Sequence, residues 1–128
     1  MSDKQVVRTE AAPAPFQGAP YSQAIAAGGF VFVSGQLGLQ PGDSAISGGI
    51  EEQTEQVFAN LKAILEEAGT SLDRLVKTTV FLQSLDDFQA MNGVYAAHVG
   101  DRPPARATIE VAKLPSGALV EIEAIALL

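Results

Sequence analysis

The sequence predicts an α+β fold, in which two helices cover one face of a β-sheet as a two-layer sandwich. Two segments, at 50–68 and directly after 84–87, repeat apolar residues with the three-and-four spacing of an amphipathic helix. Short apolar runs precede, separate and follow these segments, which gives the order β-β-α-β-α-β-β. The last of these runs alternates between an apolar and a mixed face, as expected of a strand that borders a core.

The N-terminal part of the chain predicts a short edge strand, a loop and a hairpin. Val6 and Val7 form a brief apolar run, and the stretch after them is rich in alanine and proline. Proline cannot donate a ladder hydrogen bond, so the chain is expected to leave the sheet there. Residues 23–27 and 30–34 then flank Gly28-Gly29, which is a two-residue hairpin signal.

The central part predicts the two helices and the strand between them. The helix at 50–68 has acidic residues in its first turns and is followed by Gly69, a natural stop. Residues 76–82 are rich in valine and threonine, which favours a strand. The segment 84–87 (SLDD) resembles a capping box, and it opens the second helix, whose apolar face includes Phe88 and Tyr95.

The chain ends with two predicted strands, at about 105–112 and 119–127, joined by a turn at 114–117. The apolar face of the last strand consists of Val120, Ile122, Ala124 and Ala126. Glu121 and Glu123 lie on its other face together with Ile125 and Leu127. Because the helices cover only one side of the sheet, we expect the mixed side to contact another subunit.

Composition and charge exclude several classes of protein. The 128 residues fit one domain, and the net charge is −7. The eight lysine and arginine residues form no basic stripe, which argues against a nucleic-acid partner. With no cysteine and His98 as the single histidine, thiol catalysis and thiolate zinc sites are excluded. Because no signal peptide and no run of about 18 apolar residues is present, we expect a cytoplasmic protein without a membrane partner.

Arg106 and Glu121 are the strongest candidates for a functional site. A guanidinium stays charged and matches a carboxylate with two parallel hydrogen bonds. Pro103-Pro104 stiffens the approach to Arg106, as suits a pre-organised anion clamp, although a surface ion pair explains Arg106 equally well. Glu121, on a partly apolar strand face, is expected to pair, with Arg106 on a neighbouring strand as a candidate, or to have a raised pKa.

Other residues give weaker signals. Tyr21, at the exit of the proline-rich loop, could cover a pocket or only pack, and Ser34-Gly35 could donate to an anion or only end a strand. Asn92 interrupts the apolar face of the second helix, where a surface amide is the simpler interpretation. His98 is interpreted as a packed or surface histidine rather than a general base. Gly48-Gly49 is not a phosphate-binding loop, because no lysine follows it.

Six segments, in this order, resemble the reactive intermediate deaminases, also called the RidA, YjgF/YER057c/UK114 or endoribonuclease L-PSP family. They are GAPYSQA at 18–24, VSGQ at 33–36, VKTTV at 76–80, DF at 87–88 with Asn92, PAR at 104–106 and EIEA at 121–124. The resemblance covers about residues 6–127 and implies a single domain over 1–128, with a flexible terminus at 1–5. It also implies a chorismate-mutase-like fold with a mixed sheet, and a homotrimeric barrel with active sites between subunits.

The resemblance implies a reaction as well. Relatives hydrolyse 2-imino acids such as 2-iminobutanoate and 2-iminopropanoate, or their enamine tautomers, to 2-oxo acids and ammonia, and they use no cofactor or metal. The ligand would therefore be a small 2-imino or 2-oxo acid. Two alternatives stay open: a sensor or chaperone that binds small carboxylates, and an endoribonuclease or translation inhibitor, against which the negative charge argues.

Carried over by position, the resemblance gives roles to eight residues. Arg106 matches the arginine that grips the substrate carboxylate, and Glu121 matches the glutamate that positions the attacking water. The substrate-binding positions of the pocket match Tyr21, Ser34, Gly35, Asn92, Ala107 and Thr108. The chain departs from many relatives at Pro103, where they have an aromatic residue, and at Thr108, where many have cysteine. Both departures concern substrate preference more than the type of reaction.

Overall fold

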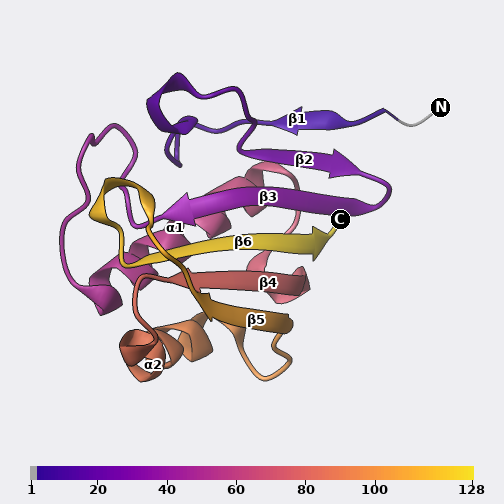
Figure 1. The fold of residues 1–128 in the computed structure, drawn as a ribbon. Helices are drawn as coiled ribbons and strands as arrows, with labels where there is room; N and C mark the ends of the chain where they lie inside the picture. The colour runs from indigo at the N-terminus through magenta and orange to yellow at the C-terminus, as the bar shows by residue number, and fades with distance from the viewer. Residues whose placement is uncertain (1–2) are drawn as a thin grey trace.

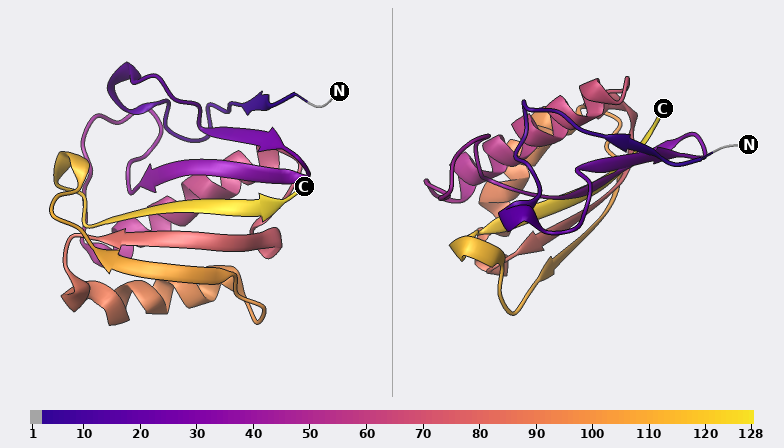
Figure 2. Two further views of the ribbon diagram at one scale, coloured as in Figure 1. Left: turned by 45° about the vertical axis from the view of Figure 1, so that its right-hand side comes forward. Right: turned by 90° about the horizontal axis from the view of Figure 1, so that it is seen from above.

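The computed structural model describes residues 3–128 as a six-stranded sheet with two helices packed on one face (Figure 1). The strands are β1 (Gln5–Val7), β2 (Ala24–Ala27), β3 (Phe30–Leu37), β4 (Leu75–Leu82), β5 (Ala105–Glu110) and β6 (Val120–Leu127), and the helices are α1 (Ile50–Glu67) and α2 (Phe88–Val99). Figure 2 shows, in its view from above, that both helices lie on one side of the sheet and leave the other side bare. The predicted α+β class is therefore confirmed.

Two expectations about the whole chain have a narrower outcome. Residues 1–2, part of the segment expected to be flexible, lie outside the described range, whereas Gln5 already pairs with Ala26 of β2. No helix within residues 3–128 has the length and apolar content that crossing a membrane requires. The cytoplasmic location stays a prediction.

The order of the strands is β1-β2-β3-β6-β4-β5, so β6 is central and β5 lies at an edge. β4 and β5 are parallel, and α2 connects them. A helical crossover places two strands side by side and parallel, so β5 lies beside β4 rather than beside β6. The expectation that Arg106 and Glu121 lie on neighbouring strands is therefore wrong, because β4 separates them.

The hydrophobic core lies between the helices and one face of the sheet. The apolar stripe of α1 is buried as predicted, and so is the apolar face of β6, from Val120 to Ala126. The largest side chains with almost no exposure include Phe58, Leu61, Ile64, Leu65, Leu82, Met91 and Ile122. The strand alternation seen in the sequence thus identifies which face of β6 meets the helices.

Asn60 of α1 fixes the chain where it leaves β3. Its Nδ2 donates to the carbonyl oxygens of Leu37 at 3.1 Å and Leu39 at 2.9 Å. Its Oδ1 accepts a hydrogen bond from Gln56 at 2.9 Å. A buried amide with all these partners holds the end of β3 firmly on the helix, because breaking any of them would leave a buried polar group unpaired.

Gly38 allows the chain after β3 to pass directly against α1. A Cβ atom at Gly38 would lie 2.7 Å from the Cα and 2.9 Å from the carbonyl oxygen of Gln53. These are backbone atoms of a helix and cannot move aside. We therefore expect Gly38→Ala to lower the free energy of unfolding by about 1–3 kcal/mol through overpacking.

Urea unfolding followed by circular dichroism measures this effect. Gly93→Ala in α2 is the matched control, because a Cβ atom at Gly93 meets no atom within 4 Å. Alanine is also the better helix former, so the control should be as stable as the wild type or slightly more stable. Equal unfolding midpoints for all three proteins would contradict the close contact.

Candidate functional site

Glu121 lies beside an irregularity in β3, on the face of the sheet that the helices leave bare. The pairing of β3 with β6 shifts register between Val33 and Gln36, which places Ser34 and Gly35 in a bulge. A Cβ atom at Gly35 would overlap the Glu121 carboxylate. Glycine at this position therefore makes room for the carboxyl group, and the bulge supplies the floor of the site.

The surroundings of Glu121 favour a proton-accepting carboxylate. Burial raises the pKa of the Glu121 carboxyl above its usual range, and the neighbouring Glu123 carboxylate raises it further. This confirms one of the two states expected for Glu121 from the sequence, the raised pKa rather than an ion pair with Arg106 in the same chain. A carboxylate with a raised pKa is a stronger base and can hold and deprotonate a water molecule.

A hollow of about 450 Å³ opens beside Glu121 on the bare face of the sheet. Its walls are formed by Phe16, Ala19, Tyr21, Ser34, Gly35, Leu37, Pro115, Glu121 and Glu123. Four residues named from the sequence, at positions 21, 34, 35 and 121, are thus brought together. The apolar contributors Phe16, Ala19 and Pro115 were not predicted, because such residues carry no chemical signal in a sequence.

Hydrogen bonds of Tyr21 and Ser34 shape these walls. The Tyr21 hydroxyl accepts a hydrogen bond from the backbone N–H of Phe16 at 2.6 Å. The Ser34 hydroxyl donates to the carbonyl oxygen of Ser22 at 2.6 Å, and the backbone N–H of Ser34 donates to Gln23 at 2.9 Å. Ser34 therefore acts as a structural part of the wall, because both of its donors already have protein partners.

Arg106 forms a second group of candidate residues, beneath α2 at the edge of the sheet. Its guanidinium carbon lies 4.7 Å from the centre of the Tyr95 ring and 5.6 Å from that of Phe88. These contacts orient the guanidinium without neutralising its charge. The two rings were predicted only as part of the apolar face of α2. Within residues 3–128 Arg106 makes no ion pair, so the alternative of a surface salt bridge is not supported.

Asn92 and Thr108 flank this guanidinium in sequence and in the fold. Asn92 lies one helical turn after Phe88, and Thr108 lies two residues after Arg106, on the same face of β5. Asn92 Oδ1 and Thr108 Oγ1 are both buried and have no hydrogen-bond partner among the described residues. Buried polar atoms without partners are rare, so this region can accept polar contacts from a ligand.

The two groups lie on opposite faces of the sheet. Arg106 is in register with Thr78 of β4, and Thr78 is in register with Ala124 of β6. Both Thr78 and Ala124 are buried on the side of the helices, whereas Glu121 points to the bare side. Ala107 follows Arg106 and, by alternation, faces the bare side. One protomer cannot place Arg106 and Glu121 around the same small ligand.

The remaining candidates have structural roles. His98 stacks on Phe58, with ring centres 4.6 Å apart, and its Nε2 contacts a carboxylate oxygen of Glu55. This agrees with its interpretation as a packed histidine. No three His, Asp or Glu side chains of residues 3–128 come together as a metal site would require. That the reaction needs no metal or cofactor stays a prediction from the resemblance.

Comparison with known proteins places this geometry in context. The model of the family described as endoribonuclease L-PSP matches residues 9–128. A RutC family protein of Pyrococcus abyssi is 52% identical over 124 residues, which cover 96% of each chain. The chloroplastic Reactive Intermediate Deaminase A of Arabidopsis thaliana is 48% identical over 126 residues, covering 98% of this chain and 66% of that protein. The crystal structure of E. coli TdcF with bound serine superimposes with a TM-score of 0.88 at 35% identity, covering 97% of this chain and 98% of that one.

Proposed function

The chain belongs to the RidA family, also called the YjgF/YER057c/UK114 or endoribonuclease L-PSP family, and we propose that it hydrolyses reactive 2-imino acids or enamines to 2-oxo acids and ammonia. The observation that carries the proposal is the presence of two separate reactive groups, an oriented guanidinium at Arg106 and a basic carboxylate at Glu121. The names of two relatives add support, since one is a reactive intermediate deaminase and the other holds serine, a small amino acid.

The proposed assembly is a homotrimer in which Glu121 of one subunit meets Arg106 of the next. The bare face of the sheet exposes five large apolar side chains, Val6, Phe30, Phe32, Ile109 and Leu127. A single-domain protein gains stability by covering such a face with another copy of itself. Contacts between different patches of identical subunits close into a ring, and this arrangement joins the two groups that one protomer keeps apart.

In the proposed reaction, Arg106 grips the substrate carboxylate through two parallel hydrogen bonds. This holds the adjacent imine carbon in the hollow beside Glu121 of the neighbouring subunit. Glu121 accepts a proton from a water molecule while the water oxygen bonds to that carbon and the C=N electron pair moves to nitrogen. Protons then reach the nitrogen, the C–N bond breaks, and ammonia leaves as the C=O bond of the 2-oxo acid forms.

The most direct test couples the protein to a threonine dehydratase that releases 2-iminobutanoate from threonine. We expect the wild-type protein to accelerate the loss of the imine, measured by trapping the remaining imine with semicarbazide. No acceleration would sink the proposal. Binding of 2-oxobutanoate without any turnover would instead favour a carboxylate-binding sensor or chaperone.

Gly35→Ala tests the position of the Glu121 carboxylate without removing it. The added methyl group would occupy the space of that carboxylate and push it away from the attacking water. Because a displacement of about 1 Å can cost roughly a hundredfold in rate, we expect a loss of that order in kcat. Gly93→Ala is again the control and should keep wild-type activity. An unchanged kcat for Gly35→Ala would show that the carboxylate position is not critical.

The pH dependence of activity tests the protonation state of Glu121. Catalysis should fall as the pH drops through the raised pKa of Glu121, because the protonated carboxyl can no longer accept a proton from water. Glu123→Gln removes one of the two causes of that raised pKa, so the acid limb of the profile should move to lower pH. The measurement is kcat/KM across the acid range, corrected for imine loss without protein. An acid limb that stays in place would contradict the role of Glu121.

A further inference from the structure

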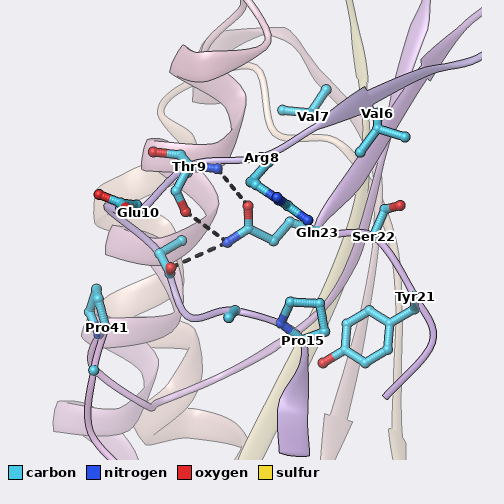
Figure 3. Close-up of a pocket in the computed structure, with 13 residues that line it drawn as sticks. Val6, Val7, Arg8, Thr9, Glu10, Pro15, Tyr21, Ser22, Gln23 and Pro41 are labelled. Carbon is cyan, nitrogen blue, oxygen red and sulfur yellow. Dashed lines mark hydrogen bonds between the residues drawn. The ribbon is translucent and has the colours of Figure 1, made fainter. Parts of the chain in front are cut away.

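The side chain of Gln23 joins the proline-rich loop to the start of β2 (Figure 3). Gln23 is only 4% exposed. Its Oε1 accepts a hydrogen bond from the backbone N–H of Thr9 at 2.7 Å. Its Nε2 donates to the carbonyl oxygens of Thr9 at 3.0 Å, Ala12 at 3.2 Å and Pro13 at 2.8 Å. The whole amide is therefore used to hold one short stretch of loop.

The loop has few other attachments. Within residues 3–128, the hydrogen bonds that connect loop 9–20 with other parts of the chain end on Gln23 or on Tyr21. The remaining bonds of the loop are internal, such as that from Gly18 to the carbonyl oxygen of Pro15 at 3.1 Å. Ala12 is buried in the core and adds one apolar anchor. Gln23 is thus the main polar link between this loop and the sheet.

The same loop forms a wall between two cavities. On one side is the hollow beside Glu121, to which the loop contributes Phe16 and Ala19. On the other side is a cavity of about 400 Å³, whose lining includes Arg8, Thr9 and Pro15. Tyr21 borders both, and its hydroxyl is held by the N–H of Phe16. Moving the loop would therefore open the hollow toward the second cavity.

Gln23 also contacts the floor of the site through its own backbone. Its carbonyl oxygen accepts the hydrogen bond from Ser34, directly before the glycine under Glu121. We propose that Gln23 is a positioning residue, which locks the loop wall onto the bulge of β3 and thereby determines how tightly the small substrate is held. This inference rests on the proposed function of the same site.

Two variants remove the lock in different ways. Gln23→Met keeps a similar volume but loses all four hydrogen bonds, whereas Gln23→Glu keeps the acceptor and loses the three donations to carbonyl oxygens. Because poor positioning alone lowers catalysis steeply, we expect kcat/KM for 2-iminobutanoate to fall about tenfold or more, mainly through a rise in KM. Hydrogen exchange at the backbone amides of loop 9–20 should become faster in both variants.

Thr70→Val is the matched control for the loss of a buried hydrogen bond. Thr70 Oγ1 donates to the carbonyl oxygen of Leu127 at 2.6 Å, at the opposite end of β6 from Glu121. This variant should melt at a lower temperature but keep the wild-type KM and loop exchange. The same rise in KM for Thr70→Val, or a wild-type KM for Gln23→Met, would overturn the proposal.

Wild-type measurements keep the two proposals separate. Exchange at the loop amides should slow when 2-oxobutanoate is bound, and unchanged exchange would overturn the positioning role even if neither Gln23 variant folds. If the wild type shows no deaminase activity, the proposed function fails, and the role of Gln23 is then judged by 2-oxobutanoate affinity and loop exchange. If the wild type is active and the Gln23 variants match it, only the inference about Gln23 fails.

Discussion

Arg106→Ala is expected to lower kcat/KM for 2-iminobutanoate by roughly a hundredfold or more, because hydrogen bonds to charged groups contribute about 1.5–3 kcal/mol each and two are lost. Fold stability should change much less, since the lost cation–π contacts with Tyr95 and Phe88 are worth about 0.5–2 kcal/mol. Coupled imine-loss kinetics and thermal melting of the same preparation measure the two effects side by side.

Two further variants show whether the planar fork of Arg106 matters. Arg106→Lys keeps the positive charge but not the bidentate geometry, so its activity should lie between those of wild type and Arg106→Ala. Arg74→Ala is the control for the loss of an arginine, because Arg74 is exposed and donates to the carbonyl oxygen of Leu128, away from both candidate groups. Full activity in Arg106→Ala would show that this guanidinium does not hold the substrate.

Mixing two inactive variants, Arg106→Ala and Glu121→Gln, is expected to restore activity. The two residues lie on opposite faces of the sheet within one chain, so a complete site needs Arg106 from one subunit and Glu121 from another. With random assembly of equal amounts, about a quarter of the sites in a closed ring would receive both intact residues. The mixture should therefore reach about a quarter of the wild-type kcat.

Differently tagged subunits, refolded together and purified through both tags, provide the mixed oligomers for this measurement. The control is the double variant Arg106→Ala/Glu121→Gln mixed with either single variant, which cannot form an intact site. Activity restored only in the mixture of single variants would demonstrate sites shared between subunits. Verified mixed oligomers that stay inactive would contradict the shared site, whatever the number of subunits.

Local patterns were sufficient to predict most of the elements. The helix predicted at 50–68 is observed as Ile50–Glu67, and the strand predicted at 76–82 as Leu75–Leu82. The strand predicted at 105–112 is shorter, because β5 follows its partner β4 only as far as Glu110 opposite Leu82. The extent of an edge strand depends on the neighbour with which it pairs, and no residue in the strand itself encodes that limit.

The chemical character of the candidate site was also available before the fold. A guanidinium behind two prolines and a carboxylate among apolar residues are informative wherever they lie in space. Their relation could not be obtained in this way. It depends on the crossover through α2, on the bulge at Ser34-Gly35 and on the hydrogen bonds of Gln23, each of which joins segments distant in sequence.

By itself, the sequence determined the order of helices and strands, the family, and which side chains could carry charge or accept a proton. These are properties of residue type, spacing and short motifs. Only the tertiary structure decided that Arg106 and Glu121 lie on opposite faces, with β4 between their strands. The physical reason is that the helix between β4 and β5 makes these strands parallel neighbours and sends β5 to the edge, away from β6.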